Sequence, residues 1–195
     1  MVEGGCDRSS ERRCARTIIE MREPVGDVPG RTPPDVFDVA ERLLGWLGPM
    51  EPSDLFRLVD HTQACHVTWF GVPLFEAPIE AWGRGPVVRL LFHAYAGQFI
   101  VHTVDGDAEA LDSDARRVVD FVAFQYGPMR GSQLASVTFS YEPLREAFSR
   151  RSATEISLAS MKRYHSQDVD LMDARRHWTG AAGPSGERHD ETSFD

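Results

Sequence analysis

The stretch from Phe70 to Val88 constrains the fold most, because it combines turn-forming residues with large apolar side chains. It holds three of the chain's 12 prolines and three of its 16 glycines, so it predicts fixed turns rather than a helix, which interior proline would break. Leaving Phe75 and Trp82 in water would forgo roughly 1.5–3 kcal/mol each. We therefore expect this stretch, named the knuckle below, to pack on a core as a turn-rich segment or a short β-hairpin. Its apolar side chains are Leu74, Phe75, Ile79, Trp82, Val87 and Val88.

Apolar residues at helical spacing predict two helices before the knuckle. Residues 32–47 form the first, with Thr32 as its cap and proline in its first turn. The second begins after Pro52, with Ser53 as its cap, and stops before Gly71, a residue type that favours helix C-termini. Its leucines mark a core face, and we expect its polar residues to form an exposed surface. These polar residues are Arg57, Asp60, His61 and Gln63.

Caps, stops and apolar spacing predict the remaining helices in the same way. The third begins at Pro86, and the later ones cover residues 112–126, 134–139, 143–148 and 157–164. Residues 99–104 predict a short strand. The predicted fold class is therefore mainly α: a compact single-domain helical bundle of about six to seven helices, with the knuckle or hairpin between the second and the third.

Composition divides the chain into three parts. Residues 1–31 mix arginines, acids, glycines and prolines, which predicts a disordered N-terminal extension. Residues 32–167 carry the helical signals and form the predicted domain. Residues 168–195 predict a polar, loosely ordered C-terminal tail, in which Leu171, Met172 and Trp178 are the side chains able to dock on the domain.

The charge balance narrows the class of partner. The chain has 30 acidic and 21 basic residues, a formal net charge of −9, and Lys162 as its only lysine. Proteins that neutralise phosphates are usually basic or carry a dense basic stripe, so we expect no nucleic acid and no membrane as partner. Cys6, Cys14 and Cys65 form no paired framework, and no stretch has the apolar length of a signal peptide or membrane span. The expected location is the cytoplasm.

Chemical motifs in the sequence are weak. His61, Cys65 and His66 lie within six residues of one another, but a structural zinc site normally has four ligands and no cysteine pair supports these three. His66 and three carboxylates could together form an acid/base site, but we favour the interpretation of those carboxylates as surface groups. The carboxylates are Glu76, Glu80 and Glu142. With no nucleophile elbow, phosphate loop or zinc-protease helix, we expect no catalytic residue, no cofactor and no metal, and a protein that is not an enzyme.

The knuckle also forms a long motif of rare residue types, Gly71-x-Pro73-Leu74-Phe75-x-x-x-Ile79-x-Ala81-Trp82-x-x-Gly85-Pro86-Val87. In this motif the chain resembles the Panacea domain, also called the SocA-like antitoxin domain, at every position of that family's pattern. The resemblance extends over residues 36–167. The chain departs from the family where the second helix tends to carry aromatics, since it has Asp60, His61 and Cys65 there, and Leu144 stands where the family tends to have tryptophan.

The resemblance implies a helical antitoxin, in a phage or prokaryotic toxin–antitoxin system, that binds and neutralises a toxin protein encoded beside it. The alternative is a phage- or host-encoded adaptor or regulatory protein that uses the same domain to bind another protein or deliver it to a protease. Rigid aromatics and arginines make good interface anchors, so we place the partner-binding candidates on the second helix and the knuckle. They are Arg57, Gln63, His66, Glu80, Trp82, Arg84 and Pro86. For Trp82 the other interpretation is a core anchor of the knuckle.

Overall fold

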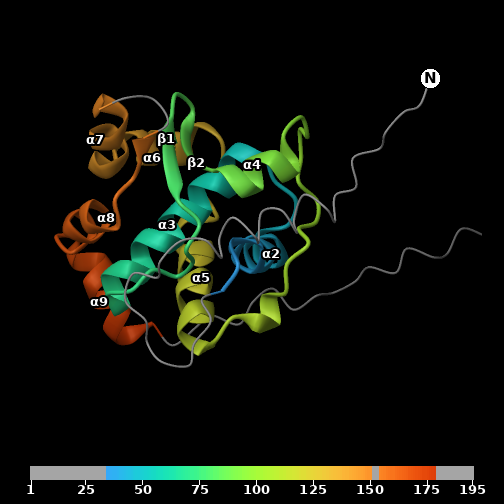
Figure 1. Cartoon of the computed structure of the whole chain (residues 1–195). Coiled ribbons are helices and arrows are strands. Elements are labelled where there is room, and N and C mark those ends of the chain that lie inside the picture. Colours follow the sequence, from blue (N-terminus) through green and yellow to red (C-terminus); the bar gives the residue numbers. More distant parts are fainter. Residues whose placement is uncertain (1–33, 151–153, 179–195) are drawn as a thin grey trace, which may run out of the picture.

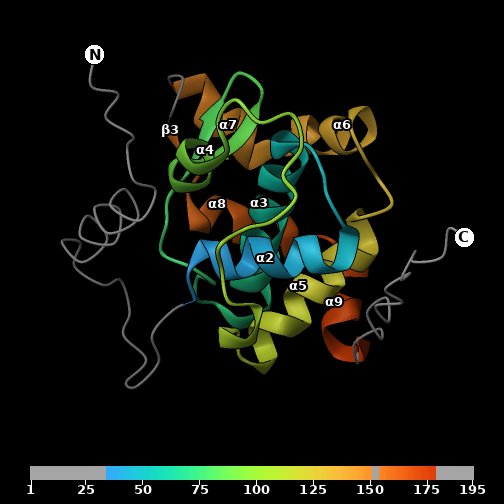
Figure 2. The same cartoon turned by 90° about the vertical axis from the view of Figure 1, so that its right-hand side faces the viewer.

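Helix α3 (Pro52–Phe70) is the axis of the structure, a computed structural model that describes residues 34–150 and 154–178. Every residue from Asp54 to Trp69 is buried, because α2, α5, α8 and the strand β2 all pack against this helix (Figure 1). Helix α2 (Val36–Leu47) crosses it on one side, with α5 (Ser113–Tyr126) adjacent to both (Figure 2).

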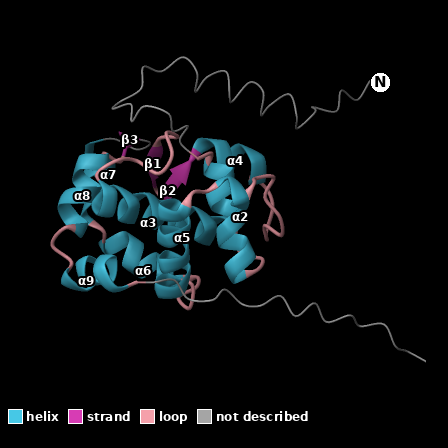
Figure 3. Ribbon diagram, turned by 90° about the horizontal axis from the view of Figure 1, so that it is seen from below, coloured by secondary structure: helices cyan, strands magenta, loops and turns pink. Residues whose placement is uncertain are grey.

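The described residues form eight α-helices and a small antiparallel sheet, which confirms the predicted mainly helical class. The remaining helices are α4 (Arg89–Tyr95), the 3-10 helix η1 (Ala108–Ala110), α6 (Ser132–Ser140), α7 (Glu142–Arg150), α8 (Leu158–His165) and α9 (Val169–His177). The strands are β1 (Ile79–Trp82), β2 (Gly85–Val88) and β3 (Thr154–Glu155). Figure 3 shows the sheet between α7 and α4.

The first helix begins later than predicted. Asp35, rather than Thr32, is the N-cap of α2: its side chain accepts a hydrogen bond from the amide of Phe37 at 3.1 Å, and Asp38 reciprocates at the amide of Asp35. Thr32 and the predicted 1–31 extension lie outside the described residues. A paired Arg42–Asp120 contact, at 2.7 and 2.8 Å, then ties α2 to α5.

The second helix has the predicted span but a different environment. It ends at Gly71, whose φ of 83° lies in the left-handed region that favours glycine. Ser53 does not cap it, since the N-cap is Glu51 and makes no side-chain cap bond among the described residues. The expected polar surface is wrong, because neighbouring elements cover α3 all round and enclose its polar residues.

The knuckle contains a β-hairpin, one of the two predicted forms. β1 and β2 are antiparallel, with Ile79 opposite Val88 and Trp82 opposite Gly85, and β3 adds to the other edge of β1. The predicted helix start at Pro86 is wrong: Pro86 lies inside β2, and α4 starts only at Arg89. Proline lacks an amide donor and is therefore confined to edge strands, and β2 is such an edge.

The predicted strand over residues 99–104 is also corrected. This segment makes one isolated bridge, in which Met50 and Val101 exchange backbone hydrogen bonds at 3.2 and 2.8 Å. Val101 and Val104 are buried, whereas Phe99 is 92% exposed. The segment therefore buries two valines three residues apart and pairs with no extended strand in the part of the chain described.

The end of the domain lies beyond residue 167. Helix α9 covers the first part of the predicted loose tail; Asp168 caps it by accepting from the amide of Leu171 at 3.1 Å. The indole of Trp69 donates to the carbonyl of Leu171 at 3.2 Å, and Arg117 donates to the carbonyl of Trp178 at 2.9 Å. These contacts attach α9 to α3 and α5. Among the described residues, no helix has the length and apolar character needed to cross a membrane.

We expect Trp69→Ala to lower the free energy of unfolding by about 3–5 kcal/mol, because its ring is 1% exposed and packs on Phe121 with centroids 5.0 Å apart. Urea denaturation measures this directly. The control Phe99→Ala removes an exposed ring and should stay within about 0.5 kcal/mol of the parent. Equal effects of the two substitutions would contradict the central position of α3.

Candidate functional site

Buried polar side chains of α3 hold the knuckle from inside. The guanidinium of Arg57, 7% exposed, donates to Asp54 at 2.9 Å and to the backbone carbonyl of Arg84 at 3.1 Å. The other carboxylate oxygen of Asp54 accepts from the amide of Gly131 at 2.9 Å. One ion pair thus connects α3 to the hairpin turn and to the start of α6.

Gln63 and His66 continue this attachment toward the beginning of the knuckle. The Gln63 amide group donates to the carbonyl of Phe75 at 2.8 Å, while its oxygen accepts from the amides of Leu74 and Phe75 at 2.8 and 3.3 Å. Nδ1 of His66 lies 2.9 Å from the carbonyl oxygen of Val72. Both side chains are 2% exposed, so the expectation that the polar side of α3 faces a partner is corrected: these residues position the knuckle.

The outer side of the knuckle carries a compact group of side chains that reach solvent. Glu80 accepts hydrogen bonds from Nε1 of Trp82 at 2.9 Å and from Nε of Arg89 at 2.6 Å. The Arg89 guanidinium also lies 5.8 Å from the centre of the Trp82 ring, which stacks at a tilt on Phe92 at 5.0 Å. Together with the exposed Arg84, these residues form what we call the hairpin face: Glu80, Trp82, Arg84, Arg89 and Phe92.

The Glu80 carboxylate keeps its charge within the hairpin face. Partial burial raises the pKa of Glu80, but the hydrogen bonds from Arg89 and Trp82 and the charge of Arg89 outweigh it, so the pKa lies below its usual range. Glu80 is therefore ionised at neutral pH and keeps the indole and the guanidinium oriented. Pro86, the remaining candidate, is buried in β2 and supports the hairpin rather than its surface.

A second group of polar residues lies entirely inside the protein. We call it the interior cluster: Asp60, His61 and Cys65 of α3, Tyr141 before α7, and His165 of α8. The His61 ring stacks on Tyr126 with centroids 4.6 Å apart, and it lies 6.1 Å from Tyr141 and 6.5 Å from His165. No hydrogen-bond partner in the described chain reaches either carboxylate oxygen of Asp60, either nitrogen of His165, or the Tyr141 hydroxyl.

Burial keeps the interior cluster uncharged. It raises the pKa of Asp60 to about 8, and it lowers that of His61 to about 3 with a further contribution from His165. The pKa of His165 falls to about 4 because of burial, although Asp168 opposes this shift. Burial also raises the pKa of the Cys65 thiol and of Tyr141. Burial thus keeps the Cys65 thiol protonated at neutral pH, whereas the thiolate is the nucleophilic form of cysteine.

The three metal-type residues of the second helix do not converge. His61 and Cys65 belong to the interior cluster, whereas His66 contacts the knuckle backbone at Val72. Over residues 34–150 and 154–178, no set of three histidine, cysteine or acidic side chains is arranged to hold a metal ion.

Nothing in the sequence marked Tyr126, Tyr141 and His165 as neighbours of His61, because they come from separate segments far along the chain. The one local signal was the polar run Asp60-His61 within a helix that proves to be buried.

Comparison of the chain with protein-family models, with curated proteins and with solved structures finds no match in any of the three.

Gln63→Leu should lower the free energy of unfolding by at least about 2 kcal/mol, since each buried backbone group left without its partner costs about 1–3 kcal/mol. Hydrogen exchange at the amides of Leu74 and Phe75 should accelerate more than exchange in α2. Gln125→Leu, on the exposed side of α5, is the matched control and should change neither quantity. Unchanged exchange in the knuckle would show that Gln63 does not hold it.

Asp60→Asn should stabilise the protein relative to the parent increasingly as pH rises from about 4 to about 8. The pKa of Asp60 is about 8 in the fold against an ordinary 3.8, so the contribution of its protonated form is complete below about 3.8 and is lost as pH rises through 8. This changes the folding equilibrium by up to about tenfold per pH unit. Urea denaturation at about pH 5 and pH 8 provides the comparison.

Asp170→Asn, at an exposed position of α9, is the matched control for Asp60→Asn and should follow the parent at both pH values. If the difference between Asp60→Asn and the parent does not change between the two pH values, the carboxyl of Asp60 is not held neutral by the fold.

Proposed function

We propose that this protein is an antitoxin that neutralises a cognate toxin protein by direct, stoichiometric binding through the hairpin face. Two observations support this. The knuckle motif resembles that of the Panacea domain, and the structure presents the outer side of the same segment as a fixed, partly exposed aromatic and charged surface. The single observation that carries the proposal is the arrangement at Glu80, which orients both Trp82 and Arg89 toward the surface.

The motif residues divide into two kinds by their position. Five of its apolar side chains are buried and belong to the core, so they specify the knuckle fold rather than a contact: Leu74, Phe75, Ile79, Ala81 and Val87. Trp82 is only half-buried, and the two residues that follow it, Gly83 and Arg84, are exposed at the hairpin turn. The hairpin turn is therefore a part of the motif that a partner can contact.

The hairpin face has the properties of an interface anchor. Tryptophan and arginine are enriched among the residues that carry most of the energy at protein interfaces. Ordering side chains and loops on binding costs affinity, and here the Arg57 and Gln63 bonds already fix the backbone beneath the face. Of the candidate partner-binding residues, Glu80, Trp82 and Arg84 remain in the proposed contact, while Arg57, Gln63, His66 and Pro86 support it from inside.

Arg84→Glu should abolish protection from the toxin and co-purification with it, because it reverses the exposed charge at the hairpin turn of the proposed contact. The melting temperature should change little, since surface substitutions typically stay within about 0.5 kcal/mol. The experiment co-expresses the chain with the product of its neighbouring gene and measures growth and pull-down. Arg145→Glu, an exposed arginine of α7, is the matched control and should protect like the parent.

The outcomes separate the alternatives. If Arg84→Glu still protects and co-purifies, the binding surface lies away from the hairpin face. If the neighbouring product binds the chain but does not inhibit growth, the antitoxin proposal fails and the adaptor alternative takes its place.

A further inference from the structure

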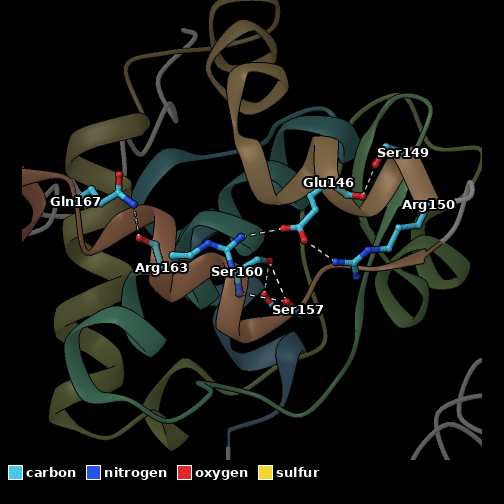
Figure 4. Close-up of polar contacts among 7 residues, drawn as sticks. All are labelled: Glu146, Ser149, Arg150, Ser157, Ser160, Arg163 and Gln167. Atoms are coloured by element: carbon cyan, nitrogen blue, oxygen red, sulfur yellow. Dashed lines mark hydrogen bonds and ion pairs between the residues drawn. The ribbon is translucent and has the colours of Figure 1, made fainter.

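Helix α8 depends on a small number of buried side chains. It has eight residues, and three of them are buried: Ser160, Met161 and His165. An isolated helix of this length is unstable in water, so its packing on α3 has to hold it. Ser157 caps its start by accepting from the amide of Ser160 at 3.1 Å. Figure 4 shows Glu146 of α7 accepting from Arg163 at 3.0 Å, an exposed ion pair of the kind that contributes little.

The segments on both sides of α8 have attachments of their own. Before it, the amide of Ile156 donates to the carbonyl of Ile79 at 2.8 Å, next to the β1–β3 pairing. After it, the bonds from Trp69 and Arg117 attach α9 to α3 and α5. These contacts do not involve α8, so they would stay in place if α8 alone detached.

The contact between α8 and α3 brings two buried imidazoles together. His165 and His61 are 4% and 2% exposed, and their rings are nearly perpendicular with centroids 6.5 Å apart. Tyr141 and Tyr164 lie 5.2 and 5.3 Å from His165. In the described structure Nδ1 of His61 and both nitrogens of His165 have no hydrogen-bond partner, and Nε2 of His61 is 3.4 Å from the hydroxyl of Thr138.

Every element packed around the imidazoles contributes uncharged groups, with one exception. The titratable and polar neighbours are Asp60 and Cys65 of α3, Tyr126 of α5, Thr138 of α6, Tyr141 before α7, Tyr164 of α8 and Asp168 after α8. Asp168 opposes the neutral form of His165, but its carboxylate already caps α9. A second proton on Nδ1 of His61, or on the His165 ring, would thus be buried without a hydrogen-bond acceptor among the described residues, beside a second imidazole that disfavours it.

We propose that α8 is an acid-released element, which packs on α3 while His61 and His165 are both neutral and detaches locally on acidification to uncover the His61–Cys65 side of α3. This inference does not depend on the proposed antitoxin activity. It concerns a different face of the domain and a property of the isolated chain.

The direction of the pH effect follows from the two states. In the closed form the pKa values of His61 and His165 are about 3 and 4, below the ordinary 6.5 that applies once the rings are exposed. The contribution of the two histidines to the closed form is therefore complete above pH 6.5 and is lost as pH falls below it. Each histidine raises the opening equilibrium by up to about tenfold per pH unit. Asp60, if opening exposes it, releases one proton and cancels one of these factors.

Hydrogen exchange on the full chain, followed by mass spectrometry at about pH 7, 6 and 5 and corrected for intrinsic rates, tests the proposal. The opening constant of α8 should rise about tenfold to hundredfold per pH unit below 6.5, whereas α2 and α5 should stay protected. His165→Phe keeps a ring among the surrounding rings but takes up no proton, so it should reduce the pH dependence by about tenfold per unit. His177→Gln, at an exposed position of α9, should behave like the parent.

Three results would overturn the inference. These are exchange of α8 that does not depend on pH after correction, loss of protection in α2 and α5 together with α8, and the same slope in His165→Phe as in the parent. If His165→Phe does not fold, His61→Phe carries the same expectation. Proton NMR of the parent is independent of any variant, because a ring resonance of His61 or His165 that titrates near pH 6.5 in the closed protein contradicts the proposal.

Discussion

The complete burial of the middle of α3 is the constraint on which the rest of the structure depends. A buried polar group costs free energy unless it finds a hydrogen-bond partner or gives up its charge, and α3 shows both solutions. Arg57 and Gln63 bind the backbone of the knuckle. Asp60 and His61, about one turn away from each, find no such backbone and are neutral instead. The attachment of the knuckle and the interior cluster thus both follow from the burial of polar residues in α3.

Hydrogen bonding and loss of charge have different consequences for the elements that α3 holds. Hydrogen bonds from inside the core and the Glu80 contacts on the outside hold the hairpin from both sides, which suits a surface that must not lose entropy on binding. The interior cluster holds α8 by ring packing without a hydrogen bond at the His165 ring, and on this we base the proposal that α8 is released by acid.

Local signals predicted much of the fold. Gly71 and Asp112 mark helix ends through backbone conformation and capping, which depend on neighbouring residues alone. The prediction of a helix start at Pro86 was wrong because proline is compatible with an edge strand as well as with the first turn of a helix. The complete burial of α3 could not be predicted from the sequence, because the spacing of apolar residues does not distinguish a helix covered on one side from one covered by α8 and α9 as well. The unpredicted burial of α3 affected the candidate site most. Trp82 and Arg84 reach the surface, whereas Arg57 and Gln63 are buried.

The bond between Arg57 and residue 84 has a consequence for how such a domain can change over generations. Arg57 binds the main-chain carbonyl at position 84 and makes no use of the side chain there. Any residue at this position offers the same carbonyl, so the hairpin keeps its shape whichever side chain it displays. If the hairpin face binds a partner as proposed, substitutions at the turn can alter what it recognises while the bond from Arg57 stays the same.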